Sequence, residues 1–190
     1  MRYPVAIMAL LLLGGCASAP KNTTNSCAIF REQSGFLTNW RGAAERTSAE
    51  FGVPVSVLMA TIQAESNFEP RARPPRRQLL GFIPWKRQST AYGYAQALNG
   101  TWSDYQSRTG RSLSRRNNFA DAIHFVGWYH HQNHRQTGIA LNDAYNLYLA
   151  YYSGPAGYAR GSWKSDPAAR RGARRAADMA ARYEAQLRSC

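Results

Sequence analysis

The stretch PVSVLMATIQAES, residues 54–66, decides the fold class. Its apolar side chains recur every three or four residues, at Val55, Leu58, Met59 and Ile62. This spacing is typical of an α-helix with a buried face. Pro54 suits the first turn of a helix, where an N–H is not needed. The residue before a proline disfavours the helical region, so we expect this helix to end before Pro70.

Glu65 lies on the apolar face of this predicted helix, three residues after Ile62 and seven after Leu58. At about 100° per residue, these three side chains project to the same side. Burial raises the pKa of a carboxyl group, and an acid that stays protonated near neutral pH can act as a general acid. Glu65 is therefore the candidate catalytic residue. The alternative is a glutamate that ends the helix and turns to solvent.

Most of the remaining chain also has helical spacing and capping residues. We expect further helices over residues 36–51, 101–108, 118–138 and 143–153, and from residue 166 onward. Residues 70–90 and 154–161 fit no period and are expected to be loops, and no segment is a convincing strand. The sequence therefore predicts a mainly α fold.

The N-terminus has the layout of a secretory signal peptide, with Arg2, an apolar stretch over residues 3–13 and then small residues. The apolar run is too short to span a bilayer. Cys16 follows it directly, which resembles a bacterial lipoprotein signal with a lipidated cysteine. The alternative is an ordinary cleaved signal peptide.

These features predict the domain organisation and the location of the protein. We expect a lipoprotein signal peptide over residues 1–15, the lipidated Cys16 and a tether over 16–30, and one domain over 31–190. An aspartate directly after the lipidated cysteine would resemble an inner-membrane retention signal, and this chain has Ala17 at that position. The expected location is therefore the periplasmic face of the outer membrane.

Two further cysteines, Cys27 and Cys190, lie near the ends of the remaining chain. An even number of cysteines in an oxidising compartment indicates a disulfide, and the termini of a compact domain often lie close together. The alternative is two free buried thiols.

The net charge is +13, from 24 Lys and Arg against 11 Asp and Glu. Such a chain attracts polyanions. Export argues against nucleic acid as the partner, which leaves the carboxylates of the cell wall and lipid head groups. The alternative is that the charge serves solubility alone.

Three short segments stand in order along the chain: ES at residues 65–66, AYGYAQAL at 91–98 and AYYSGP at 150–155. Together they resemble the motifs of the soluble lytic transglycosylase (SLT) catalytic domain family. The resemblance covers roughly residues 51–161 and implies a helical domain similar to goose-type lysozyme.

The resemblance also implies which residues form the site. Glu65 matches the catalytic acid, and Ser66 matches the serine beside it, which is expected to bind substrate. Gly93 and Gln96 match the glycine and glutamine of a Gly-Leu-Met-Gln motif that lines the glycan cleft. Tyr151 matches the tyrosine of an Ala-Tyr-Asn motif that contacts the acid or the sugar.

The chain departs from these motifs at three positions. Tyr94 and Ala95 replace the Leu-Met pair, and Tyr152 replaces the asparagine. These three replacements are expected to affect how substrate is positioned in the cleft. We expect Tyr152 to bind substrate together with Tyr151.

The implied reaction cleaves the β-1,4 bond between N-acetylmuramic acid and N-acetylglucosamine in the glycan strands of peptidoglycan, and leaves a 1,6-anhydro-muramyl end. Glu65 would protonate the leaving oxygen and then deprotonate the muramyl 6-hydroxyl. Several of the 11 acidic residues are expected to cap helices, so few remain that could act as a second catalytic carboxylate. The alternatives are a hydrolytic muramidase and a catalytically weakened peptidoglycan-binding lipoprotein.

A pair of histidines and a basic segment also need an interpretation. His130 and His134 lie one helical turn apart, but no acidic or cysteine ligand is near them in the sequence, so we expect no metal and no cofactor.

The basic segment 71–87 is either a wall or lid of the cleft that holds peptide carboxylates, or a solvated loop. We expect the protein to be a monomer.

Overall fold

The computed structural model describes residues 18–35, 38–79 and 83–190, and for residues 77–79 and 83–86 it describes the backbone alone. The described part is mainly helical, which confirms the predicted fold class. The helices, with one short 3-10 helix η1, are α1 (Ser26–Glu32), α2 (Trp40–Phe51), α3 (Val55–Ser66), α4 (Asn99–Thr109), α5 (Phe119–Thr137), α6 (Ala144–Ala159), η1 (Ser162–Ser165) and α7 (Pro167–Leu187). Two strands, β1 (Arg76–Leu79) and β2 (Ile83–Arg87), form an antiparallel hairpin.

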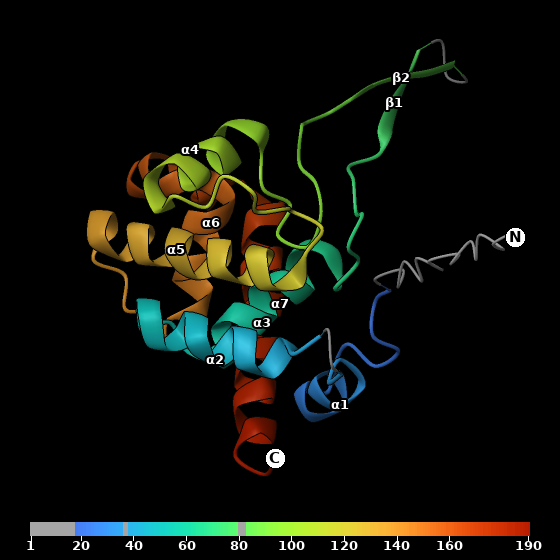
Figure 1. Ribbon diagram of the computed structural model, residues 1–190. Helices are drawn as coiled ribbons and strands as arrows, with labels where there is room; N and C mark the ends of the chain where they lie inside the picture. The colour runs from blue at the N-terminus through green and yellow to red at the C-terminus, as the bar shows by residue number, and fades with distance from the viewer. Residues whose placement is uncertain (1–17, 36–37, 80–82) are drawn as a thin grey trace, which may run out of the picture.

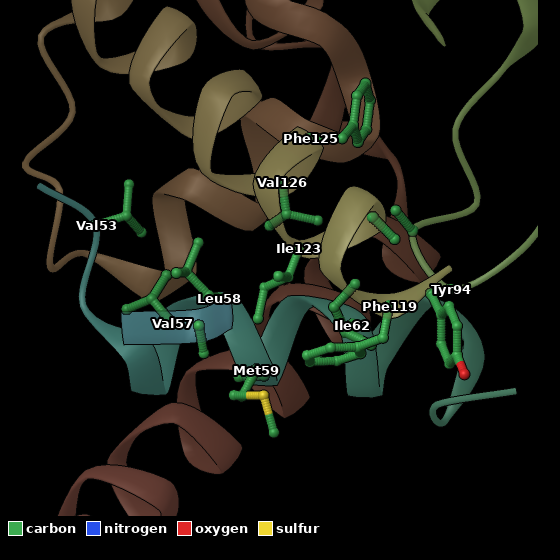
Figure 2. Packing of buried hydrophobic residues seen from close by; sticks show 14 of the residues in the cluster. Val53, Val57, Leu58, Met59, Ile62, Tyr94, Phe119, Ile123, Phe125 and Val126 are labelled. Carbon is green, nitrogen blue, oxygen red and sulfur yellow. The ribbon is translucent and has the colours of Figure 1, made fainter. Parts of the chain in front are cut away.

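The central element is α3, around which α2, α5 and α7 pack (Figure 1). Residues 56–62 of α3 are all buried, as expected of a helix covered on every side. Figure 2 shows Leu58 and Ile62 of α3 lying beneath Ile123 and Val126 of α5. Burial of α3 fixes the direction of its last turn, which carries Glu65.

The helix ends follow signals that are local in the sequence. Side-chain oxygens of Asn118, Asp143 and Asp166 accept hydrogen bonds from first-turn N–H groups of α5, α6 and α7. Gly52 and Gly138 end α2 and α5 with φ of 73° and 75°.

Two segments expected to be loops contain regular structure. The expectation of no strand in residues 70–90 was wrong, because β1 and β2 pair there with Leu79 opposite Ile83. Pairing between strands is a contact across the chain, and this segment has neither polar–apolar alternation nor a standard two-residue turn to reveal it. Helix α6 also continues beyond a kink at Gly154 to Ala159, although 154–161 was expected to be a loop.

The packed domain begins within the expected tether of residues 16–30. Ser26 starts α1, Ile29 and Phe30 are buried, and the backbone N–H of Ser26 donates to Gln186 of α7 over 2.8 Å. The sulfur atoms of Cys27 and Cys190 lie at bonding distance, with their Cα atoms 6.0 Å apart. The expected signal peptide and Cys16 lie outside the described residues. In the described ranges, no helix is long and apolar enough to span a membrane.

Candidate active site

A cavity of about 530 Å³ lies beside the last turn of α3. Its walls come from α3, the segment before α4, the first turn of α4, and the facing sides of α5 and α6. The lining residues are Glu65, Ser89, Ala91, Gln96, Ala97, Leu98, Thr101, Phe125, Tyr129, Tyr151, Tyr152, Ser153 and Gly154. Among these described lining residues, Glu65 is the only acidic one.

The environment of Glu65 favours its protonated form. Burial raises the pKa of the Glu65 carboxyl group to about 7, and an interaction with the Tyr148 hydroxyl partly offsets this rise. The side chain nevertheless lines the cavity and is partly accessible to solvent. Near neutral pH, Glu65 can therefore both donate and accept a proton at the cavity wall.

Tyr148 connects Glu65 to α7. A Cβ atom on Gly172 of α7 would lie 2.8 Å from Cε1 of the Tyr148 ring, so only glycine leaves room for this ring. The sequence did not reveal this contact, because it joins residues of two different helices. The Tyr148 hydroxyl is thereby held near the carboxyl group of Glu65.

The chain reverses direction immediately after Glu65 through two left-handed residues. Asn67 has a φ of 51° and Phe68 a φ of 62°. This conformation is unfavourable for a phenylalanine. Phe68 is fully buried and packs on Trp40 with ring centroids 5.8 Å apart, and this packing offsets the strain. The reversal carries Glu69 off the helix and away from the cavity lining.

Tyr151 joins α6 to the second motif. Its hydroxyl donates to the backbone carbonyl of Ala95 over 2.6 Å, and its ring packs edge-on against Tyr129 at 5.3 Å. Burial raises the pKa of the Tyr151 hydroxyl well above its usual value, and the charge of Glu65 raises it further. Tyr151 therefore stays neutral beside the acid.

Gln96 lines the cavity and also holds its wall together. Its Nε2 donates to the carbonyls of Ala72 and Gly93 over 3.0 and 2.8 Å. These bonds tie the segment after α3 to the turn that contains the second motif. The side-chain carbonyl oxygen of Gln96 is the atom left for a ligand.

The three departures from the family motifs lie in different places. Tyr94 and Ala95 are buried and do not line the cavity. The Tyr94 ring packs edge-on against the rings of Trp40 and Phe119, and Figure 2 shows Tyr94 beside Phe119. Tyr152 lines the cavity and is 52% exposed. Only Tyr152 changes the surface that a ligand would meet.

Ser66 and Gly93 were expected to bind substrate, but neither lines the cavity. The hydroxyl of Ser66 donates to the carbonyl of Ile62 over 3.2 Å. Gly93 has a φ of 76°, and a Cβ atom there would lie 2.1 Å from the carbonyl oxygen of Arg116. The structure thus gives Gly93 a packing role.

Several residues that line the cavity were not predicted from the sequence. Phe125 and Tyr129 lie one turn apart on α5, and Leu98 is 47% exposed at the cavity. Helical spacing placed Phe125 and Tyr129 on a helix, but it could not show which aromatic residues face the cavity.

Three of the four histidines of α5, those in its second half, contact three different partners. His130 Nε2 lies 2.8 Å from Thr61 Oγ1, His131 Nδ1 lies 3.1 Å from the Phe51 carbonyl, and His134 Nδ1 lies 2.7 Å from the Ile139 carbonyl. Burial lowers the pKa of His130 to about 3, so this side chain is neutral. Within the described ranges, no group of three or more His, Cys, Asp or Glu side chains could hold a metal ion.

Among residues 71–76 and 87 of the basic segment, whose side chains the structure describes, none lines the cavity. The hairpin of β1 and β2 projects from the helical body (Figure 1). Arg76 and Arg87 are exposed at its base, and neither lines the cavity.

Comparisons with known proteins agree with this architecture. A family model described as a transglycosylase SLT domain matches residues 4–190. The fold is similar to that of an inactive mutant of the lytic transglycosylase Slt from Pseudomonas aeruginosa, with a TM-score of 0.54 and 16% sequence identity. The similarity covers 86% of this chain, which spans 28% of the length of that protein. No curated protein matches the chain. Since the family model matches nearly the whole chain, the protein belongs to the transglycosylase SLT domain family.

Proposed function

We propose that this protein is a peptidoglycan lytic transglycosylase with Glu65 as its catalytic residue. The observation that carries the proposal is a single carboxyl group, with a pKa raised to about 7, in the wall of a cavity of about 530 Å³. Glycosidases with two catalytic carboxylates need the second on the other side of the bond. Among the described lining residues no second carboxylate is present.

The proposed reaction uses Glu65 twice. The protonated carboxyl group donates its proton to the glycosidic oxygen between N-acetylmuramic acid and N-acetylglucosamine as the anomeric C–O bond breaks. The resulting carboxylate then accepts the proton of the muramyl 6-hydroxyl, whose oxygen bonds to the anomeric carbon of the same sugar. The product is a 1,6-anhydro-muramyl end, and the intramolecular attack has a large proximity advantage.

Other acidic residues have partners of their own and do not line the cavity, although Asp166 also interacts with the hydroxyl of the lining residue Tyr152. Asp143 and Asp166 cap α6 and α7, Asp121 accepts from the backbone N–H of Arg115, and Asp104 pairs with Arg108. Glu69 lies outside the cavity lining. This distribution supports a mechanism that needs one carboxyl group.

The test is mass analysis of products released from purified sacculi by wild type, Glu65→Gln and the matched control Glu69→Gln. We expect anhydro products from wild type and from Glu69→Gln, and a rate lower by about 10²–10⁴-fold for Glu65→Gln, as is usual when a general acid is lost. Products with ordinary reducing ends would show a hydrolytic muramidase instead. Binding of sacculi without turnover by the wild type would show a non-catalytic wall-binding protein.

We also propose that Cys16 is lipidated and anchors the domain to the periplasmic face of the outer membrane. Support comes from the apolar stretch and small residues that directly precede Cys16. Labelling of cells with radioactive palmitate should mark the wild type and not Cys16→Ser. Equal labelling of both would refute the anchor.

A disulfide between Cys27 and Cys190 is proposed from their position. The bond would join α1 to the end of α7 and close a loop with a sequence separation of 163. Alkylation of the denatured, secreted protein before and after reduction, followed by mass analysis, should reveal two thiols only after reduction. Two free thiols before reduction would refute the bond.

A further inference from the structure

Two arginine side chains lie over the ring of Tyr92, close to the cavity. The Cζ atom of Arg73 is 4.2 Å from the ring centroid, and the Cζ atom of Arg116 is 5.3 Å from it. Arg73 comes from the segment after α3, and Arg116 comes from the segment before α5. The Tyr92 ring therefore brings together two positive charges from distant parts of the sequence.

Both charges lack an acidic partner. All 11 acidic residues lie in the described ranges, and none forms an ion pair with Arg73 or Arg116 there. Glu69, the nearest acidic residue in sequence to Arg73, accepts instead from the backbone N–H of Arg71 at 3.5 Å. Burial lowers the pKa of Arg116, and the charge of Arg73 lowers it further. Two like charges over one ring repel each other, and a bound anion would reduce that repulsion.

The guanidinium groups of the two arginines differ in the hydrogen bonds that they make. Arg116 donates from Nη1 to the carbonyls of Thr90 and Ala97 over 3.0 and 2.8 Å, so it also fixes the cavity wall. Arg73 is exposed, and in the described part of the chain its guanidinium has no hydrogen-bond partner. Its planar fork of N–H groups matches a carboxylate in two-point contact.

The segments that carry this pair adjoin the cavity lining in sequence. Tyr92 directly follows Ala91, which lines the cavity, and Thr90 lies between two lining residues. Ala72, the residue before Arg73, accepts a hydrogen bond from the lining residue Gln96. Neighbouring Cα atoms are about 3.8 Å apart, so the backbone that carries Tyr92 and Arg73 lies next to residues of the cavity wall.

We propose that Arg73 and Arg116, held on the ring of Tyr92, form an anion subsite that binds a carboxylate of the peptide stem carried by the glycan strand. This inference rests on the proposed function, which places a glycan strand in the cavity. The muramyl sugar carries its peptide on a lactyl group in amide linkage, so an intact strand offers the carboxylates of the stem, and removal of the stem frees the lactyl carboxylate. The subsite gives stem-bearing strands an advantage over strands without charged stems.

The test compares three soluble strand preparations. The first keeps its stems, the second has all carboxylates converted to methylamides, and the third has its stems removed by an amidase, which frees the lactyl carboxylate. With the wild type, we expect KM for intact strands to be about fivefold lower than for the other two, with kcat similar, because the contact is made equally in the ground and transition states.

Arg73→Gln should remove this difference, and Arg71→Gln is the matched control with the same loss of charge. An equal change in both variants, or a stem preference that Arg73→Gln leaves intact, would overturn the subsite. If strands without stems have the same low KM as intact strands, and amidated strands have a higher KM, the subsite binds the lactyl carboxylate. The assignment to the stem is then wrong.

Equilibrium binding separates this proposal from the proposed function. Dissociation constants for the three preparations are measured with Glu65→Gln and with the double variant Glu65→Gln/Arg73→Gln, so that turnover is not required. A wild type without turnover, but with a fivefold preference for intact strands that depends on Arg73, would refute the catalytic proposal alone. No dependence on Arg73 would refute the subsite whether or not the wild type is active.

Discussion

The hydroxyl of Tyr151 donates a hydrogen bond to the backbone carbonyl of Ala95 over 2.6 Å, and this bond fixes α6 against the loop that carries Gln96. Tyr151→Phe keeps the ring and removes the bond. Its loss should lower the free energy of unfolding by about 1–3 kcal/mol, since the Ala95 carbonyl is left without its partner. The rate on glycan strands should also fall by about tenfold or more, because the cavity wall is no longer held in place.

Thermal unfolding and initial rates measure the two effects. Tyr145→Phe is the control on the same helix, because the Tyr145 hydroxyl has no hydrogen bond within the described ranges. Losses of the same size in both variants would show that the Tyr151 bond has no special role.

The pH dependence of activity should report the protonation of Glu65. The free enzyme must hold the proton to act as a general acid, and the pKa of Glu65 is raised to about 7. We therefore expect kcat/KM to fall about tenfold per pH unit above pH 7. The Tyr148 hydroxyl lowers this pKa, so Tyr148→Phe should move the inflection to higher pH. An inflection that stays in place or moves down would contradict the contact between Tyr148 and Glu65.

The same raised pKa makes the fold sensitive to pH. The unfolded chain ionises Glu65 near pH 4.5, whereas the folded protein ionises it near pH 7. Between these values the folded state binds more protons, so this group's contribution to stability is present below pH 4.5 and is lost as the pH rises to about 7. Glu65→Gln cannot ionise and should be more stable than the wild type at pH 8, by up to about 3 kcal/mol.

Calorimetry at pH 4 and pH 8 checks this prediction, with Glu69→Gln as the control. The stability difference between Glu65→Gln and the wild type should grow from the lower to the higher pH, and the control should show no such growth. A difference that is independent of pH would mean that the carboxyl group is not buried enough to matter.

The features that depend on residues close together in the sequence could be predicted from it. Pro54, the apolar spacing of α3 and the caps at Gly52, Asn118 and Asp166 act within a few residues, so they could be read directly. The position of Glu65 on the face of α3 followed from the same spacing.

The remaining features depend on contacts between distant segments. The assignment of Gly93 to substrate binding rested on a motif, and the motif could not show that the carbonyl of Arg116 lies against it. The room that Gly172 leaves for Tyr148 and the pairing of β1 with β2 are likewise contacts across the chain. Spacing along one helix carries no information about them.

Gly93 allows a test of its packing role against the substrate role that the motif suggested. Gly93 and Gly110 both have positive φ, 76° and 70°, but a Cβ atom on Gly110 meets nothing within 4 Å, whereas one on Gly93 meets the Arg116 carbonyl oxygen at 2.1 Å. Gly110→Ala should therefore cost about 1–2 kcal/mol for its backbone conformation alone. Gly93→Ala should cost a further 1–3 kcal/mol, because the chain must move to relieve the overlap.

Urea unfolding of both variants gives the two free energies, and initial rates on glycan strands give the effect on the site. Displacement of Gly93 should also disturb Gln96, whose Nε2 donates to the Gly93 carbonyl, so activity should fall together with stability. If Gly93 instead contacted substrate, Gly93→Ala would match Gly110→Ala in stability and would raise KM alone. The difference between the two unfolding energies thus decides which role this glycine has.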